Sequence, residues 1–131
     1  MGSTATYLAV QNLTPNNAAV SISETDDFDW DGNSRPDAEG NFNHVNIASN
    51  DTRNEREEVN SNAKSAWFRM TLVFTNDDVI SFRNDQRDAV NGISPEPRPY
   101  TLEGANASSY SLRQVVDTSS NTNTFIISKI S

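Results

Sequence analysis

The clearest strand–turn–strand pattern of the chain is AWFRMTLVFTNDDVISFRN, which spans residues 66–84. Before its central turn, apolar side chains occupy every second position, at Phe68, Met70, Leu72 and Phe74. Side chains on a β-strand point alternately to its two faces, so this periodicity predicts a strand with one buried face. The residues after the turn alternate in the same way. The stretch is therefore predicted to form a β-hairpin that supplies one side of the core.

The turn of this hairpin is predicted at Thr75–Asp77. Only a loop with an odd number of residues brings Ile80 onto the face that carries Leu72, because side chains alternate between faces. A three-residue loop needs a residue in the left-handed conformation, which Asn and Asp adopt more readily than most residues. We therefore expect Asn76 or Asp77 to take that conformation.

Short strand patterns recur along the rest of the chain. The sequence holds 17 asparagines, which together with Ser, Thr and Asp favour turns between short segments. The segments at residues 4–10 and 18–23 are expected to pair as a hairpin. We predict an all-β fold, a single-domain antiparallel β-sandwich over residues 1–131 with about 7–9 short strands and long polar loops. The further strands are predicted at residues 4–10, 18–23, 42–48, 100–102, 109–116 and 124–130.

Three segments are predicted to be polar loops, at residues 24–40, 51–64 and 85–99. The middle segment is rich in Glu and Arg and has almost no apolar side chain to bury, so we expect at most one helical turn there. The last segment contains three prolines, which cannot donate to a β-ladder.

Composition narrows the class of partner. The 131-residue chain carries a net charge of −8 and has no cysteine. Proteins bind nucleic acid and anionic lipid through Lys and Arg side chains that neutralise phosphate, so this acidic chain is expected to bind neither. No apolar run approaches the roughly 18 residues of a membrane span, and the N-terminus lacks the pattern of a signal peptide. We expect a soluble protein, cytoplasmic or released without a signal peptide.

Side chains for catalysis are sparse. His44 is the only histidine, and neither a nucleophile elbow nor a Gly-rich phosphate loop is present. A glycosidase needs one of its two carboxyl groups in an apolar site, whereas the acidic cluster of this chain lies in a polar segment. The chain is therefore not expected to be an enzyme.

One acidic segment has the spacing of a calcium-binding loop. Asp27, Asp29 and Asp31 alternate and are followed by a glycine, which suits carboxylates that converge on one cation. An EF-hand would need a bidentate acid where Ala38 stands, so that motif is excluded. A looser calcium site with Asp37 as a fourth ligand stays open, and so does a solvated acidic loop without metal. No other cofactor is expected.

Recognition of a ligand is the function that the remaining side chains favour. An aromatic side chain can stack on a sugar ring or against the quaternary ammonium of a lipid head group, while neighbouring polar side chains form hydrogen bonds. The alternative for any single candidate residue is a structural role, in which Trp67 belongs to the core and Arg69 is merely solvated. The candidate ligand-binding residues are Trp67, Arg69, His44, Asn46, Trp30 and Tyr100.

Three stretches carry a family resemblance. Residues 10–20 (VQNLTPNNAAV), residues 30–32 (WDG) and residues 100–104 (YTLEG) are similar in order and spacing to those of the aegerolysins. The resemblance implies a small acidic β-sandwich that binds membrane lipids and can serve as the targeting half of a two-component pore. The composition also resembles that of small fungal fruiting-body lectins, which act as defence toxins and are usually oligomeric.

The sequence leaves three functions open. The preferred one is a non-enzymatic lectin-type defence or recognition protein that binds cell-surface glycans. The second is an aegerolysin-like lipid-binding or pore-forming toxin component, and the third is a structural, coat or storage protein. A homo-oligomer is expected under each, because the open edges of a sandwich can pair and several weak sites together bind tightly.

Overall fold

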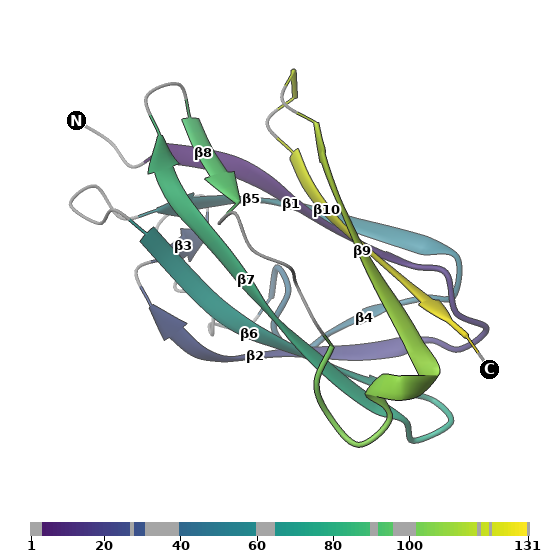
Figure 1. Cartoon of the computed structure of the whole chain (residues 1–131). Coiled ribbons are helices and arrows are strands. Elements are labelled where there is room, and N and C mark those ends of the chain that lie inside the picture. Colours follow the sequence, from purple (N-terminus) through teal and green to yellow (C-terminus); the bar gives the residue numbers. More distant parts are fainter. Residues whose placement is uncertain are drawn as a thin grey trace.

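Two β-sheets pack face to face as a β-sandwich (Figure 1). The structure is a computed structural model, and it describes residues 4–26, 28–30, 40–59, 65–89, 92–95, 102–117, 119–120 and 122–130. The first sheet has the order β3 (Phe28–Trp30), β5 (Asp51–Val59), β1 (Thr4–Asn12), β10 (Thr122–Lys129) and β9 (Tyr110–Asp117). The second has the order β4 (Val45–Ile47), β2 (Ala18–Asp26), β6 (Ser65–Phe74), β7 (Val79–Ala89) and β8 (Gly92–Pro95).

The all-β sandwich predicted from the sequence is confirmed. Eight strands form two four-stranded sheets, and the three-residue strands β3 and β4 extend one edge of each. The one helical element among the described residues is a single 3₁₀ turn, η1, at Ala107–Ser109. The pairs of neighbouring strands are antiparallel apart from β1 and β10, which run parallel.

The hairpin predicted at residues 66–84 is β6 and β7, and its inner face is the core. Phe82 of this hairpin meets Phe125 of the first sheet with 4.7 Å between ring centroids. The six apolar side chains of the inner face are at most 1% exposed: Phe68, Met70, Leu72, Phe74, Ile80 and Phe82.

The turn of the hairpin has the predicted length and conformation. The Phe74 N–H donates to the Asp78 carbonyl at 2.9 Å, and the Asp77 N–H donates to the Phe74 carbonyl at 2.9 Å. Three residues therefore separate the last pair, and Asp77 takes the left-handed conformation with φ +70°. Leu72 consequently lies opposite Ile80.

The hairpin predicted for the first two strands is wrong, because β1 and β2 belong to different sheets. The chain crosses between the sheets around the buried side chain of Asn12. Its Nδ2 donates to the carbonyls of Asn16 at 2.9 Å and Ile47 at 3.0 Å, and its Oδ1 accepts from the Thr14 N–H at 3.0 Å. These hydrogen bonds stabilise a tight connection between the two sheets. The turn residues in the sequence do not distinguish such a connection from a hairpin turn.

The polar loop predicted at residues 51–64 is also wrong for its first part, which is β5 and pairs with β1 from Asp51 to Val59. Arg53 and Glu55 lie on the inner side, opposite the buried Val10 and Leu8. They form an ion pair at 3.3 Å. Charged side chains that neutralise each other allow this strand to form without an apolar face.

The other loop predictions are partly wrong. Residues 28–30 of the first loop form β3, and residues 86–89 of the last loop pair with β8. Pro95 lies in β8, an edge strand of the kind that tolerates proline. Of the strand predicted at residues 42–48, only β4 forms, since Asn41 and His44 have positive φ and break the alternation.

Tyr110 ties the two sheets together. Its ring stacks on Phe74 with 4.8 Å between centroids, and its hydroxyl donates to the Asp78 carboxylate at 2.7 Å. Burial and this hydrogen bond raise the pKa of Tyr110 above its ordinary value of 10.0.

We expect Tyr110→Phe to lower the free energy of unfolding by about 1–2 kcal/mol, because the Asp78 carboxylate loses a donor. The folded-state pKa is raised, so this contribution is complete below pH 10.0 and is lost as the pH rises through the raised value. Urea titrations of both proteins at neutral and alkaline pH measure the difference. Tyr7→Phe, at an exposed tyrosine, is the control; an equal loss in both variants would contradict the role of Tyr110.

Candidate functional site

The outer face of the second sheet gathers most of the predicted ligand-binding residues that the structure describes. We define this outer face by the side chains of β4, β2, β6 and β7 that point away from the core. Strand pairing places Ala19 opposite both Asn46 and Val73. Trp67 and Arg69 lie nearer the start of β6 than Val73, and they alternate with the buried Phe68 and Met70.

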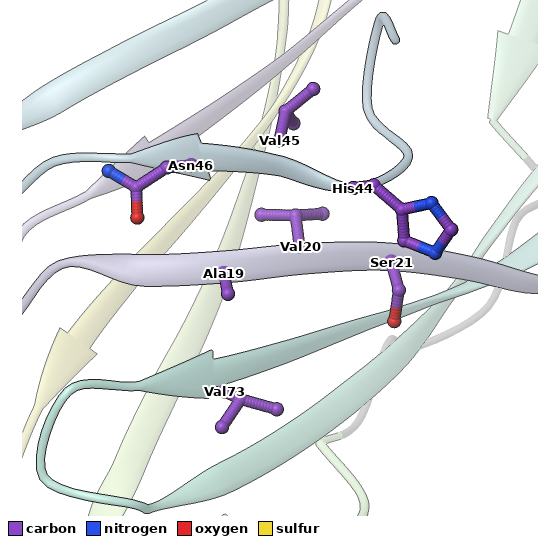
Figure 2. Close-up of a pocket in the computed structure, with 7 residues that line it drawn as sticks. All are labelled: Ala19, Val20, Ser21, His44, Val45, Asn46 and Val73. Atoms are coloured by element: carbon purple, nitrogen blue, oxygen red, sulfur yellow. The ribbon is translucent and has the colours of Figure 1, made fainter. Parts of the chain in front are cut away.

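A shallow hollow of about 360 Å³ lies on this face where β4 meets β2 and β6. Figure 2 shows Asn46 and His44 at its two ends, with Ala19 between them and Val73 across from them. Apolar atoms provide most of its surface, and Val73 is 41% exposed. The lining residues are Ala19, Val20, Ser21, His44, Val45, Asn46 and Val73.

His44 reaches the hollow because of a tight turn before β4. Gly40 and Asn43 exchange two backbone hydrogen bonds, at 3.0 and 2.8 Å, and His44 has φ +58°. The buried Asn43 accepts the Ile22 N–H at 2.8 Å, and the His44 N–H donates to the Val20 carbonyl at 2.8 Å. Both bonds fix the turn to β2, and the imidazole lies at one end of the hollow.

A second group of side chains, which we call the arginine cluster, consists of Trp67, Arg83, Arg69 and Glu103. The Arg83 guanidinium lies 4.0 Å from the centroid of the Trp67 ring. Arg69 is directly opposite Arg83 across the hairpin, and it forms an ion pair with Glu103. Arg69 and Arg83 thus place two positive charges at directly paired positions on a protein whose net charge is −8. Like charges at such positions destabilise a sheet.

Glu103 is held in place by the edge of β7. It exchanges two backbone hydrogen bonds with Ser81, at 2.9 and 2.8 Å. The next residue, Gly104, has φ +107°, and a Cβ there would lie 2.9 Å from the Val79 carbonyl oxygen. Only glycine lets the chain pass so close to β7, and this passage brings the Glu103 carboxylate to Arg69.

The outcome for the predicted residues is mixed. His44 and Asn46 lie together in the hollow, and Trp67 and Arg69 lie on the same face in the arginine cluster. The side chain of Trp30 and the whole of Tyr100 lie outside the described residues.

The sequence places Arg83 among the polar side chains beside the strands, but the list of candidate ligand-binding residues includes neither Arg83 nor Glu103. The predicted three-residue turn already implies that Arg83 lies opposite Arg69, so the hairpin register was a usable signal. No local pattern indicates Glu103, because it reaches β6 from a distant segment.

The proposed calcium ligands stay a prediction. Asp27, Asp31 and Asp37 lie outside the described residues. Asp29 lies in β3 opposite Glu58, so the segment around it is a short strand and not part of a loop. Among the residues that the structure describes, no group of three or more His, Cys, Asp or Glu side chains could hold a metal ion.

Comparison with known proteins identifies the fold. No family model and no curated protein matches the chain. The crystal structure of RahU protein in complex with a Tris molecule matches with a TM-score of 0.56 and 10% identity over 96% of both chains. That of IP-1A from Alcaligenes faecalis matches with a TM-score of 0.53 and 13% identity, over 98% of this chain and 94% of that one. Both are aegerolysin-family proteins. The chain has an aegerolysin-like fold.

The aegerolysin-like fold confirms, for the architecture, the resemblance seen in the sequence. At 10% and 13% identity the likeness is one of fold, and the site must be argued from this chain's own residues. Within the described ranges, no helix is long and apolar enough to cross a membrane.

The role of Gly104 can be tested against Gly40, since both have positive φ, +107° and +96°. Gly40→Ala carries only backbone strain, because no atom lies within 4 Å of its added Cβ. Gly104→Ala adds a clash with the Val79 carbonyl, so we expect it to lower the free energy of unfolding by about 1–3 kcal/mol more. Thermal unfolding of the two variants measures this. Equal losses would contradict the close passage at β7.

Proposed function

We propose that this protein is a non-enzymatic recognition module whose aegerolysin-like fold binds a zwitterionic phospholipid head group on the outer face of the second sheet. The observation that carries the proposal is the arginine cluster, in which two half-buried arginines and a half-buried tryptophan lie close to an exposed carboxylate.

The arginine cluster matches both charges of a zwitterionic head group. Arg69 and Arg83 lie directly opposite each other on the hairpin, and a guanidinium binds phosphate oxygens through a fixed fork of N–H donors. Glu103, at 52% side-chain exposure, offers a carboxylate to an ammonium group. Trp67 lies beneath Arg83 and adds apolar surface to which the head group can pack.

The hollow beside the arginine cluster supplies an apolar surface for the part of the lipid next to the phosphate. Its lining is mostly apolar, with Ala19 between the polar His44 and Asn46 and with Val73 across from them. Such a lining suits a glycerol backbone or the first methylene groups of a chain, whose ester or amide groups would meet the polar ends.

The net charge of −8 disfavours an anionic membrane, since long-range repulsion opposes the approach of the protein. Carbohydrate binding, which the sequence alone favoured, has no specific support from the comparisons, whereas the fold agrees with lipid-binding and toxin roles. We therefore place lipid binding first, with a role as the membrane-targeting component of a toxin.

Vesicle sedimentation tests this assignment. We expect the protein to pellet with vesicles that contain phosphatidylcholine or phosphatidylethanolamine, and Trp67→Ala or Arg83→Gln to weaken binding about tenfold, which is about 1.4 kcal/mol. The matched controls are Tyr7→Ala and Arg56→Gln, which lie opposite each other on the first sheet. Circular dichroism verifies that each variant is folded. Equal binding by all four variants would remove the site from the outer face of the second sheet.

Membrane charge gives a separate prediction. Replacing part of the zwitterionic lipid with phosphatidylglycerol is expected to weaken sedimentation at low salt, and added salt is expected to restore it, because screening shortens the repulsion. Stronger binding to the anionic vesicles would contradict the proposed head-group class. Binding to a glycan array together with failure to bind any vesicle would return the assignment to a lectin, and failure of both would favour a structural role.

A further inference from the structure

The four edges of the sandwich differ in how they are protected. An edge strand presents unpaired N–H and C=O groups that can pair with another chain, and proteins usually shorten such strands or place proline or charge in them. Three of the edge strands that the structure describes are short: β3 and β4 have three residues each, and β8 has four and contains Pro95. The fourth edge, β9, has eight residues and contains neither proline nor lysine.

The far end of β9 is also exposed and apolar. Val115 and Val116 are each 44% exposed, and they lie between Arg113 and Asp117, which are exposed as well. β9 is the longest of the four edge strands, and no other strand that the structure describes pairs with its outer edge, so it is suited to β-strand addition. The remaining question is which chain pairs with it.

We propose that β9 pairs antiparallel with β9 of a second copy, across a two-fold axis at Val115, so that the first sheets of two molecules form one continuous sheet. In this register Arg113 of each copy lies opposite Asp117 of the other. Two ion pairs then flank a contact between the two Val115 side chains. Opposite charges at directly paired positions stabilise antiparallel strands.

Neighbouring registers lack this complementarity. An axis at Gln114 would place Arg113 opposite Val115, and an axis at Arg113 would place the two arginines opposite each other. The charge pattern of β9 therefore selects one register and one partner, another copy of the same strand. Such an interface is isologous and closes at a dimer.

Local hydrogen bonds position the Asp117 carboxylate that would pair with Arg113 of the second copy. Its carboxylate accepts hydrogen bonds from the Ser119 N–H at 3.0 Å and the Ser119 hydroxyl at 2.7 Å, and these bonds lower its pKa. These hydrogen bonds hold the carboxylate near the end of the strand.

The symmetry has a consequence that rests on the proposed function. Directly paired residues of antiparallel strands point to the same side of a sheet, so the two-fold axis is perpendicular to the sheet. The outer faces of both second sheets then point in the same direction. Both head-group sites can reach one planar membrane, and the second site adds avidity without new contacts.

Cysteine crosslinking tests the register, since the chain has no cysteine of its own. Directly opposite Cα atoms in an antiparallel pair lie about 4.5–5.5 Å apart, within the range that a disulfide spans. We expect Val115→Cys to form a covalent dimer under mild oxidation without lipid. Val116→Cys, equally exposed but opposite Gln114 of the second copy, is the matched control and is expected to crosslink much more slowly. Equal rates, or no crosslinking by either variant, would overturn the proposal.

Charge reversal tests the ion pairs. Sedimentation equilibrium at about 100 μM is expected to show a dimer, for which a Kd of micromolar order suffices. Arg113→Asp is expected to raise the dimer Kd at least about tenfold, and Arg113→Asp combined with Asp117→Arg to restore it, because each pair reforms with its signs exchanged. A monomeric wild type, or a double variant that dissociates as far as Arg113→Asp, would overturn the proposal. These measurements contain no lipid, so they fail or succeed independently of the head-group assignment.

Discussion

The register of the β6–β7 hairpin determines which of its side chains fill the core and which reach the outer face of the second sheet. The three-residue turn with Asp77 in the left-handed conformation places Leu72 opposite Ile80, and a slip of one residue would exchange the two faces of the hairpin. In the register observed, aromatic and aliphatic side chains fill the core, while the same strands carry Trp67, Arg69 and Arg83 outward. Packing in the core therefore fixes the arginine cluster on the surface.

Sequence patterns predicted this hairpin because its information is local. Alternation and turn chemistry act over a few residues, and they were sufficient for the buried face, the turn and the general sandwich fold. The errors arose where long-range pairing decides the structure. Segment 51–59 is charged and became a strand because β1 supplies its hydrogen bonds, and the crossing at Asn12 is stabilised by the carbonyl of Ile47, which is 35 residues away. The same limit explains why Glu103 was missed, since it reaches Arg69 from a segment 34 residues away.

Fold and charge together restrict what the outer face can bind. The aegerolysin-like architecture is shared with RahU and IP-1A at 10% and 13% identity, so it identifies a scaffold and leaves the ligand to the side chains. The chain has a net charge of −8, and its arginine cluster contains two arginines and a carboxylate. A ligand with both a negative and a positive group satisfies that arrangement better than a purely anionic surface or a neutral sugar.

The proposed head-group site lies on the outer face of the second sheet. The most direct measurement is a heteronuclear NMR titration of the labelled protein with a short-chain, zwitterionic phospholipid below its micelle concentration. We expect shifts at the Trp67 indole N–H, at the Ser81 and Glu103 amides and in the His44 imidazole, with the Tyr7 and Arg56 amides of the first sheet unchanged. Shifts confined to the first sheet, or no saturable shift at any residue, would contradict it.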